Sequence, residues 1–212
     1  MYIPKINRFE QEPEILEFIR HHPFATVINM LDGKFWATHV PVELEKNATG
    51  EYVLHTHIAK ANPQWKSFNE NPDVMVIFQG AHAYISASWY DHENVSTWNY
   101  FAVHVYGKVR VMEGEEVVTL LDKLVNRHET QEKNPVHVND LSEKFMASHL
   151  KGIVAFEISI SDLHAMKKLS QNRDEKNYTV VIDKLQERKE VNSKSIADAM
   201  LTNKKSLFKN KK

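Results

Sequence analysis

The sequence predicts a mostly β protein with flanking helices, in which the strands form a mostly antiparallel barrel. Six or seven segments of the 212-residue chain alternate apolar and polar residues or carry runs of β-branched and aromatic residues. The first of these segments are joined by short connections, whereas a parallel βαβ unit needs a long crossover. The longer helical patterns lie near the start, after Gly114 and in the C-terminal part.

The first half of the chain is expected to begin with a helix and to continue as strands. Residues 12–22 carry Ile15, Leu16 and Ile19 at helical spacing, and Pro23 ends that run. Strand patterns follow at residues 24–30, 34–44 and 51–59. A short helix is predicted for residues 62–72. Residues 73–80 and 81–90 are expected to form a hairpin that turns near Gly80.

The second half is expected to alternate strands with longer helices. Residues 100–112 form a strand pattern, residues 117–124 a helical stripe, residues 139–150 a second helix and residues 152–166 a long half-buried strand. Two helices and a frayed basic tail beginning at Asn203 complete the chain. We expect residues 1–175 to form the barrel domain and residues 176–212 a C-terminal helical extension with the basic tail.

Composition excludes several classes of protein. The chain is 42% hydrophobic and 26% charged, with a net charge of −1 and a pI near 6.9, so it lacks the basic excess of a protein that coats nucleic acid. It has no cysteine, which excludes disulfides and thiol catalysis. No segment approaches the ~18 apolar residues of a membrane span. The segment "MYIPKINRFEQEPEIL" has no apolar core typical of a signal peptide, so we expect a cytoplasmic protein.

The stretch "HTHIAKANPQW" combines candidate ligands with a structural transition. His55 and His57 point to the same side of a strand, as two metal ligands would, but no carboxylate or cysteine follows at ligand spacing, which favours hydrogen-bonded strand histidines. Lys60 and Asn62 lie where this strand gives way to a helix beginning at Pro63. A helix start beside a lysine suits a phosphate group, and a solvated turn is the alternative.

The stretch "SWYDHENVSTWNY" places aromatic side chains among hydrogen-bonding ones. Trp89, Tyr90, Trp98 and Tyr100 can belong to the core, or they can bind a planar polar ligand or a partner subunit. The chain contains no nucleophile elbow, Walker loop or dinucleotide fingerprint.

The stretch "KKLSQNR" concentrates hydrogen-bond donors around Leu169 at the end of a long strand pattern. If the strand continues, alternation places Leu169, Gln171 and Arg173 on one side of it. Leu169 then anchors the segment, and the two polar residues are candidates for holding an anion. A solvated strand end without a ligand is the alternative.

Blocks along most of the chain resemble the PaiB family, described as FMN-binding negative transcriptional regulators. They are "MYIP" at the start, "HPFATV" at 22–27, "ATHVPVE" at 37–43, "HIAKANPQW" at 57–65, "FQGAHAYISASWY" at 78–90, "STWNYFAVHVYGKV" at 96–109, "KGIVAFEI" at 151–158 and "KLSQNR" at 168–173. The chain departs from the family at Ala87 and Ser96, where members often have proline. Those prolines would stiffen the aromatic loop.

The resemblance implies an FMN-binding split β-barrel, similar to pyridoxamine phosphate oxidases and flavin reductases, that forms a homodimer with FMN at the subunit interface. We expect Lys60, Asn62 and His57 to bind the FMN phosphate. The isoalloxazine ring is expected to lie along the backbone of Thr38, His39 and Val40. Trp98 and Asn99 are candidates for its other wall, and Gln171 and Arg173 are expected to reach FMN from the partner subunit. The valine-rich stretch "YFAVHVYGKV" is the expected dimer contact.

The resemblance also implies a role. We expect an FMN-binding negative regulator of sporulation and of degradative-enzyme production, acting on transcription, with promoter DNA or another regulatory protein as a further partner. The five lysines from Lys204 to Lys212 supply only a small basic patch for DNA. The alternative is an FMN-dependent oxidoreductase, because a flavin enzyme draws its chemistry from the cofactor and needs no catalytic triad.

Overall fold

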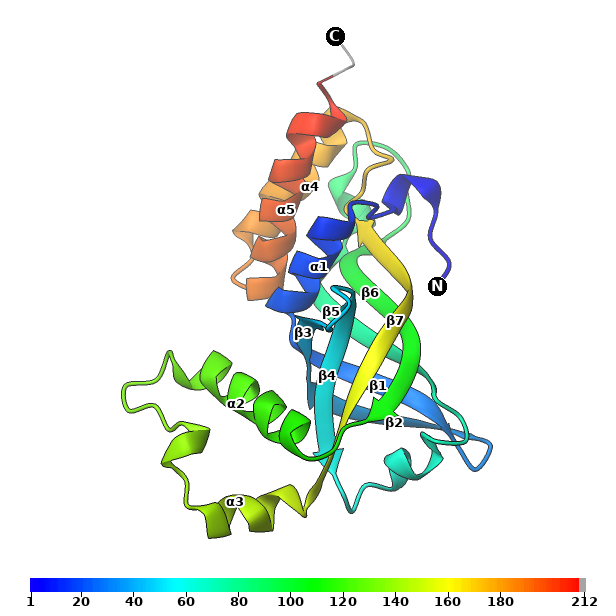
Figure 1. The fold of residues 1–212 in the computed structure, drawn as a ribbon. Helices are drawn as coiled ribbons and strands as arrows, with labels where there is room; N and C mark the ends of the chain where they lie inside the picture. Colours follow the sequence, from blue (N-terminus) through cyan, green and yellow to red (C-terminus); the bar gives the residue numbers. More distant parts are fainter. Residues whose placement is uncertain (210–212) are drawn as a thin grey trace. The chain divides into compact units, whose positions relative to one another are not determined.

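The computed structural model describes residues 1–209, which form a seven-stranded sheet with flanking helices (Figure 1). The strands are β1 (Phe24–Leu31), β2 (Lys34–Pro41), β3 (Glu43–Lys46), β4 (Tyr52–Ala59), β5 (Asp73–Ile85), β6 (Thr97–Val111) and β7 (Ile153–Lys168). The α-helices are α1 (Glu12–His21), α2 (Glu115–Glu129), α3 (Glu143–Leu150), α4 (Glu175–Glu187) and α5 (Val191–Leu207). Single 3₁₀ turns are η1 (Lys5–Asn7), η2 (Pro63–Ser67), η3 (Ala87–Trp89) and η4 (Val138–Asp140).

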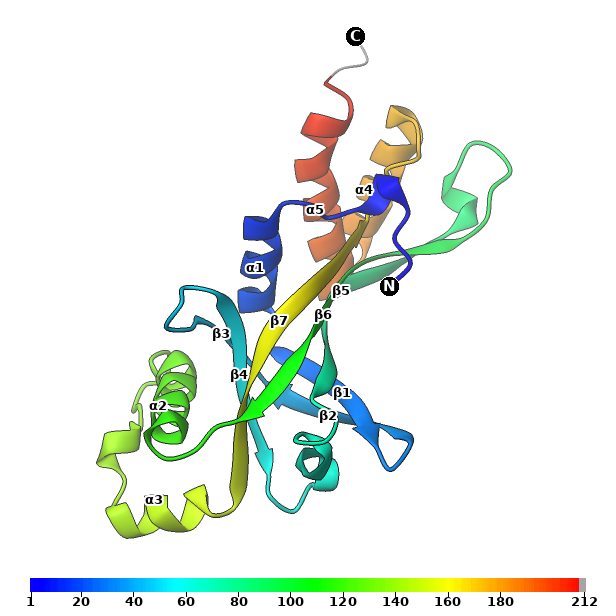
Figure 2. The same ribbon diagram turned by 45° about the vertical axis from the view of Figure 1, so that its right-hand side comes forward.

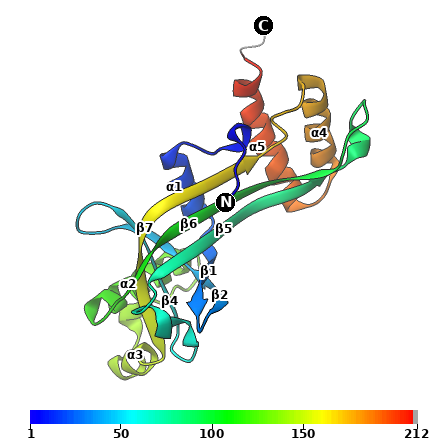
Figure 3. The same cartoon turned by 90° about the vertical axis from the view of Figure 1, so that its right-hand side faces the viewer.

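The sheet is curled, and its two edge strands, β2 and β3, follow each other directly in the sequence. Hydrogen-bonded strands follow the order β2-β1-β5-β6-β7-β4-β3, and β6 lies between β5 and β7 (Figure 3). β1 pairs antiparallel with β2 and β5, and β4 pairs antiparallel with β3 and β7. β2 and β3 stand at opposite ends of the order although only Val42 separates them. The predicted split barrel with flanking helices is therefore confirmed as a curled antiparallel sheet.

The chain forms two compact units, and β5, β6 and β7 each contribute residues to both. The barrel unit comprises residues 16–78 and 104–163. The helical unit comprises residues 1–15, 79–103 and the chain from residue 164 onward. The division therefore falls within three strands, whereas the sequence suggested a domain boundary after residue 175.

Two glycines in the barrel unit have conformations or contacts that a side chain would disturb. Gly33 has a φ of 72° in the turn that joins β1 to β2, where Asp32 also has a positive φ of 51°. A Cβ atom on Gly107 would lie 2.3 Å from the carbonyl oxygen of Ser159 and 2.7 Å from Ile158 Cγ2. Gly107 thus allows β6 to approach β7 closely.

Helix α2 lies beside strands β3 and β4 (Figure 2), and charged and apolar side chains join it to the barrel. Lys123 donates to Glu45 on β3 at 2.7 Å, and Arg127 donates to Glu43 on the same strand at 2.5 Å. Beneath these pairs, Leu120 and Leu124 pack with other buried residues of a small cluster that also contains Met112 and Ala155. The apolar stripe predicted for residues 117–124 is therefore the face that α2 turns toward the barrel.

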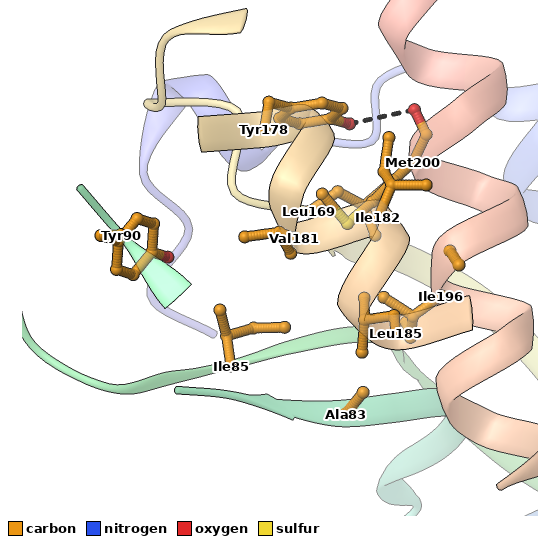
Figure 4. Packing of buried hydrophobic residues seen from close by; sticks show 11 residues of the cluster. Ala83, Ile85, Tyr90, Leu169, Tyr178, Val181, Ile182, Leu185, Ile196 and Met200 are labelled. Atoms are coloured by element: carbon orange, nitrogen blue, oxygen red, sulfur yellow. Dashed lines mark hydrogen bonds between the residues drawn. The ribbon is translucent and has the colours of Figure 1, made fainter. Parts of the chain in front are cut away.

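The helical unit has its own hydrophobic core, built between strand β5 and the antiparallel pair α4 and α5 (Figure 4). Tyr178 is fully buried, and its hydroxyl donates to the carbonyl oxygen of Met200 at 3.2 Å. Leu169 is also fully buried in this cluster, as the sequence predicted for the anchor of "KKLSQNR". A core shared by distant segments fixes the end of β7 against the two helices.

Three sequence-based expectations about elements were wrong. Residues 73–85 form one continuous strand rather than a hairpin at Gly80, because Gly80 is buried within β5 and is not among the glycines with positive φ. Residues 34–44 form two strands interrupted at Val42, where the chain passes from one sheet edge to the other. Residues 203–207 are helical in α5 rather than frayed, while residues 210–212 of the predicted tail lie outside the described residues.

Candidate functional site

The turn between β4 and η2 is fixed by backbone and side-chain hydrogen bonds. The amide of Lys60 donates to the carbonyl oxygen of Gly152 at 2.8 Å, and Trp65 Nε1 donates to the carbonyl oxygen of Lys60 at 2.9 Å. The ammonium group of Lys60 is exposed and has no partner among residues 1–209. A rigid backbone therefore carries a cation that is free to bind an anionic ligand.

Asn62 joins this turn to the edge strand β2. Its Oδ1 accepts a hydrogen bond from the amide of Gln64 at 3.1 Å, which caps η2, and its Nδ2 donates to Thr38 Oγ1 at 2.8 Å. Sequence analysis expected a helix start here that would offer free amides to phosphate. Because η2 has only five residues and Asn62 already caps it, the attraction for an anion rests on lysine side chains.

Two polar residues that sequence analysis missed fasten η2 to β1. Gln64 is fully buried, and its Nε2 donates to the carbonyl oxygen of Val27 at 3.1 Å. Asn29, also buried, donates through Nδ2 to Ser67 Oγ at 2.8 Å. A buried amide that pairs across the fold has no signature in the sequence, because its partners are 37 and 38 residues away.

The three predicted residues of β2 differ in what they expose. Val40 is 4% exposed, so only its backbone is available to a ligand. His39 is exposed, with its Nδ1 2.9 Å from Thr26 Oγ1 and its ring stacked on Phe24 at a centroid distance of 6.2 Å. β2 pairs only with β1 within the described sheet, so its outer edge offers backbone groups, as the predicted contact with a flavin ring requires.

The third residue predicted to bind the phosphate, His57, lies on β4. It is directly opposite Ala155 of β7, and Ala155 and Lys60 both line an open pocket of about 820 Å³. Its Nδ1 is buried and has no hydrogen-bond partner among residues 1–209, and burial lowers the pKa of His57. Of the predicted phosphate residues, Lys60 lines the pocket, His57 lies opposite Ala155, which also lines it, and Asn62 bonds to Thr38 of β2.

His55 pairs with a carboxylate of the neighbouring strand. His55 Nε2 lies 2.9 Å from Glu157 Oε2 across the β4–β7 pair, which is the hydrogen-bonded alternative weighed from the sequence. Residues 1–209 contain no group of three or more histidines and carboxylates placed to hold a metal ion.

The remaining predicted residues belong to the helical unit. Trp98 is 51% exposed, whereas Asn99 is fully buried, accepts from Ser170 Oγ at 3.1 Å and contacts Met200 Sδ at 3.5 Å. The side chain of Asn99 therefore holds the backbone after β7 in place. Its neighbour Trp98, on the opposite face of β6, is the one that a ligand can reach.

The segment "KKLSQNR" is a turn rather than a continued strand. β7 ends at Lys168, and Ser170 has a φ of 60°, so the expected alternation stops before Gln171. Gln171 Oε1 accepts from the amide of Leu169 at 2.7 Å, and its Nε2 donates to the carbonyl oxygen of Lys167. Sequence periodicity could not show this, because a residue in the left-handed region reverses the chain direction locally.

Arg173 is held by an aromatic ring instead of a carboxylate. Its guanidinium lies 4.8 Å from the centroid of the Tyr90 ring. Burial lowers the pKa of the neighbouring Lys168, and the positive charge of Arg173 lowers it further. Two cations kept together without an acidic partner among residues 1–209 favour an anion at this place.

The donor set fits a phosphorylated flavin. Lys60 supplies a free cation, Thr38 and Asn62 supply hydroxyl and amide groups, and β2 supplies an unpaired backbone edge. When bound, FMN supplies redox chemistry through its ring, while this chain's residues bind and orient it.

None of the helices among residues 1–209 is both long and apolar enough to cross a membrane.

Comparison with solved structures supports the fold. A "putative 5-nitroimidazole antibiotic resistance protein" from Bacteroides thetaiotaomicron superposes with a TM-score of 0.55 at 16% identity, over 75% of this chain and 85% of that one. An FAD and heme binding protein from Mycobacterium smegmatis gives a TM-score of 0.54 at 15% identity, over 82% of this chain and 78% of that one.

Comparison of sequences shows the family. The family described as "Putative FMN-binding domain" matches residues 1–162. The chain is 44% identical over 200 residues to the "Protease synthase and sporulation protein PAI 2" of Bacillus subtilis (strain 168), covering 94% of this chain and 96% of that protein. FMN, the cofactor expected from the sequence, is the ligand for which the matching domain is named. The chain therefore belongs to the PaiB family of proteins with an FMN-binding domain.

Proposed function

We propose that this protein is an FMN-binding negative regulator of sporulation and of degradative-enzyme production that acts at the level of transcription. The observation that carries the proposal is the 44% identity, over nearly the full length of both chains, to a protein named for protease synthesis and sporulation. The expected setting is the cytoplasm, and promoter DNA or another regulatory protein is the further partner. FMN binding would let the flavin state set the activity of the regulator.

The proposed cofactor site combines the residues described above. Lys60 binds the FMN phosphate, assisted by Asn62 and by His57 at the neighbouring pocket. The flavin ring lies along the backbone edge of Thr38, His39 and Val40. Trp98 forms the other wall, with Asn99 fixing the backbone behind it. Gln171 and Arg173 complete the site from the partner subunit.

The proposed dimer uses a different surface from the one expected from the sequence. Val103, Val105 and Val109 of β6 are 1%, 0% and 7% exposed, so they already belong to the protomer core. Phe24 and Phe35 are 67% and 83% exposed on the β1–β2 hairpin, and the ring of Phe24 stacks on His39. A second copy covering this hairpin would bury both rings, with Phe24 nearer to the proposed flavin position. Light scattering that reports a monomer near 25 kDa at micromolar concentration would refute the dimer.

The experiment for the proposed function uses a sporulating Bacillus strain that lacks its own PaiB protein. Expression of this chain should lower secreted protease activity and spore counts, and a Lys60→Ala variant that folds normally should restore both. Unchanged protease and spore counts with the wild-type chain would refute the regulatory role. Retention of promoter DNA by the purified protein tests whether the regulator acts on DNA directly.

A second candidate function is an FMN-dependent oxidoreductase. The observation in its favour is the pocket beside Lys60, whose lining includes the ring of Trp65 and apolar residues from β6, β7 and α2. A mixed polar and apolar pocket next to a flavin suits a small organic substrate. Steady oxidation of NADH or NADPH by the FMN-loaded protein, with an electron acceptor present, would favour this alternative.

A further inference from the structure

A second pocket, of about 650 Å³, opens within the helical unit. Its lining residues come from β5, β6, the connection between α4 and α5, and the start of α5. They are His82, Ala83, Tyr84, Trp98, Arg188, Glu190, Val191 and Asn192. Apart from Trp98, none of them belongs to the proposed FMN site. The size is sufficient for a nucleoside-sized ligand.

One wall of this pocket is aromatic and open to solvent. Tyr84 and Trp98 are 40% and 51% exposed, and their rings meet edge to face at a centroid distance of 5.8 Å. The imidazole ring of His82 lies 6.0 Å from the Trp98 ring. Large aromatic side chains that stay exposed at a pocket provide a stacking surface for a planar ring.

The lining of the pocket also includes one fixed donor group and one acceptor group. Arg188 Nη1 donates to the carbonyl oxygen of Tyr84 at 2.9 Å, and its guanidinium lies 4.7 Å from the centroid of the Trp89 ring. This leaves other N–H groups of a positioned guanidinium available. Glu190 Oε2 accepts from Ser193 Oγ at 2.8 Å, so the carboxylate is also held in place and retains acceptor capacity.

We propose that this pocket binds a planar heteroaromatic ring with a lactam edge, in which a ring carbonyl neighbours a ring N–H. The carbonyl accepts from Arg188, the N–H donates to Glu190, and the ring stacks on Trp98. Hypoxanthine, guanine and uracil have this edge, and so does the pyrimidine end of a flavin. Adenine has the same size but lacks the lactam, because an amino group replaces its carbonyl and the adjacent ring nitrogen is an acceptor.

The test compares inosine with adenosine by isothermal titration calorimetry on the full-length protein. These nucleosides carry no phosphate, so Lys60 does not contribute. Inosine should bind at least about tenfold more tightly than adenosine, since only inosine uses both polar groups. Equal affinity for the two nucleosides, or binding of neither, would overturn the proposal.

Three variants assign the contacts. Glu190→Gln keeps a carbonyl to accept from Ser193 but loses the charged acceptor, so it should weaken inosine roughly tenfold and leave adenosine unchanged. Trp98→Leu should weaken both nucleosides. Trp36→Leu is the matched control, because Trp36 is 36% exposed in the barrel unit and should not affect either. Inosine affinity unchanged in Glu190→Gln, with an unchanged melting temperature, would refute the role of the carboxylate.

A competition arm separates the two sources of the lactam edge. Riboflavin that displaces inosine, and whose binding at this pocket is lost in Glu190→Gln, would identify a flavin ring as the occupant. Riboflavin without effect on inosine would identify a free nucleobase ligand. The proposed pocket shares only Trp98 with the proposed FMN site, so the two proposals can fail separately. FMN binding should survive Glu190→Gln and should be lost in Lys60→Ala. That pattern distinguishes failure of the lactam pocket from failure of the FMN site.

Discussion

Asn62 Nδ2 donates to Thr38 Oγ1 at 2.8 Å while Oδ1 of the same side chain caps the turn that follows. One amide thus ties the end of β4 to the edge strand β2. In the proposed site, these are the two elements on which the flavin phosphate and ring depend. The pair converts two segments separated by 24 residues into one surface.

We predict that Asn62→Ala weakens both stability and FMN binding. Loss of a capping side chain costs about 1 kcal/mol, which thermal unfolding should detect as a lower melting temperature. FMN affinity, measured by quenching of flavin fluorescence, should fall with it. Asn62→Asp is the matched control, since it retains the cap and loses the donor to Thr38. FMN affinity that stays at the wild-type value in both variants would contradict the site.

We predict that Lys60→Ala reduces FMN affinity by roughly 10- to 100-fold, as expected when one or two charge-assisted hydrogen bonds to phosphate are lost. Its melting temperature without FMN should not change, because the ammonium is exposed and unpartnered among residues 1–209. Lys66→Ala, a nearby exposed lysine that lines the same pocket, measures the effect of general charge. Equal losses in the two variants would argue against a specific phosphate contact by Lys60.

We predict that FMN sites are shared between subunits. A mixed dimer is prepared from one subunit carrying Arg173→Ala and another carrying Lys60→Ala. If Arg173 reaches the FMN of the partner, one site per dimer keeps both residues and binds FMN tightly. If each site lies within one subunit, no mixed dimer retains a tight site, and the assignment of Arg173 to the partner's FMN fails.

We predict that His57 makes the protein less stable in mild acid. Burial lowers the pKa of His57 from its ordinary value of 6.5. The unfolded chain therefore takes up a proton below about pH 6.5 while the native histidine stays neutral, so stability falls as the pH decreases toward the lowered native value. Urea unfolding at pH 7.5 and 5.5 should show a smaller loss for His57→Gln than for the wild type. His21→Gln, an exposed site, is the control; the same loss in all three proteins would exclude His57 as the cause.

We predict that Gly107→Ala lowers the free energy of unfolding by about 1–3 kcal/mol, because the new methyl group would overlap the β7 backbone at Ser159. Gly152→Ala is the milder comparison, since the nearest atom to its Cβ would be the carbonyl oxygen of His149 at 3.3 Å. Denaturant midpoints of the two variants check the difference. A midpoint for Gly107→Ala at or above that of Gly152→Ala would contradict the close approach of β6 and β7.

The sequence alone determined the class of fold and most elements. Alternation along residues 97–111 and 153–168 and helical spacing in α1 and α2 are local properties, and each was read with small errors at the ends. The sequence blocks also indicated the family and the cofactor. These features are encoded within a few neighbouring residues, so no knowledge of distant contacts was needed.

Tertiary structure decided what each candidate residue can do. Asn99 is buried against Ser170, Gln171 bonds to its own turn, and the β6 valines are buried within the protomer. Gly80 lies inside β5, whose neighbours in the sheet, β1 and β6, are set by tertiary structure and not by the preference of glycine for turns. Exposure, pairing and side-chain partners depend on residues far along the chain, and a single sequence carries no record of which distant residues meet.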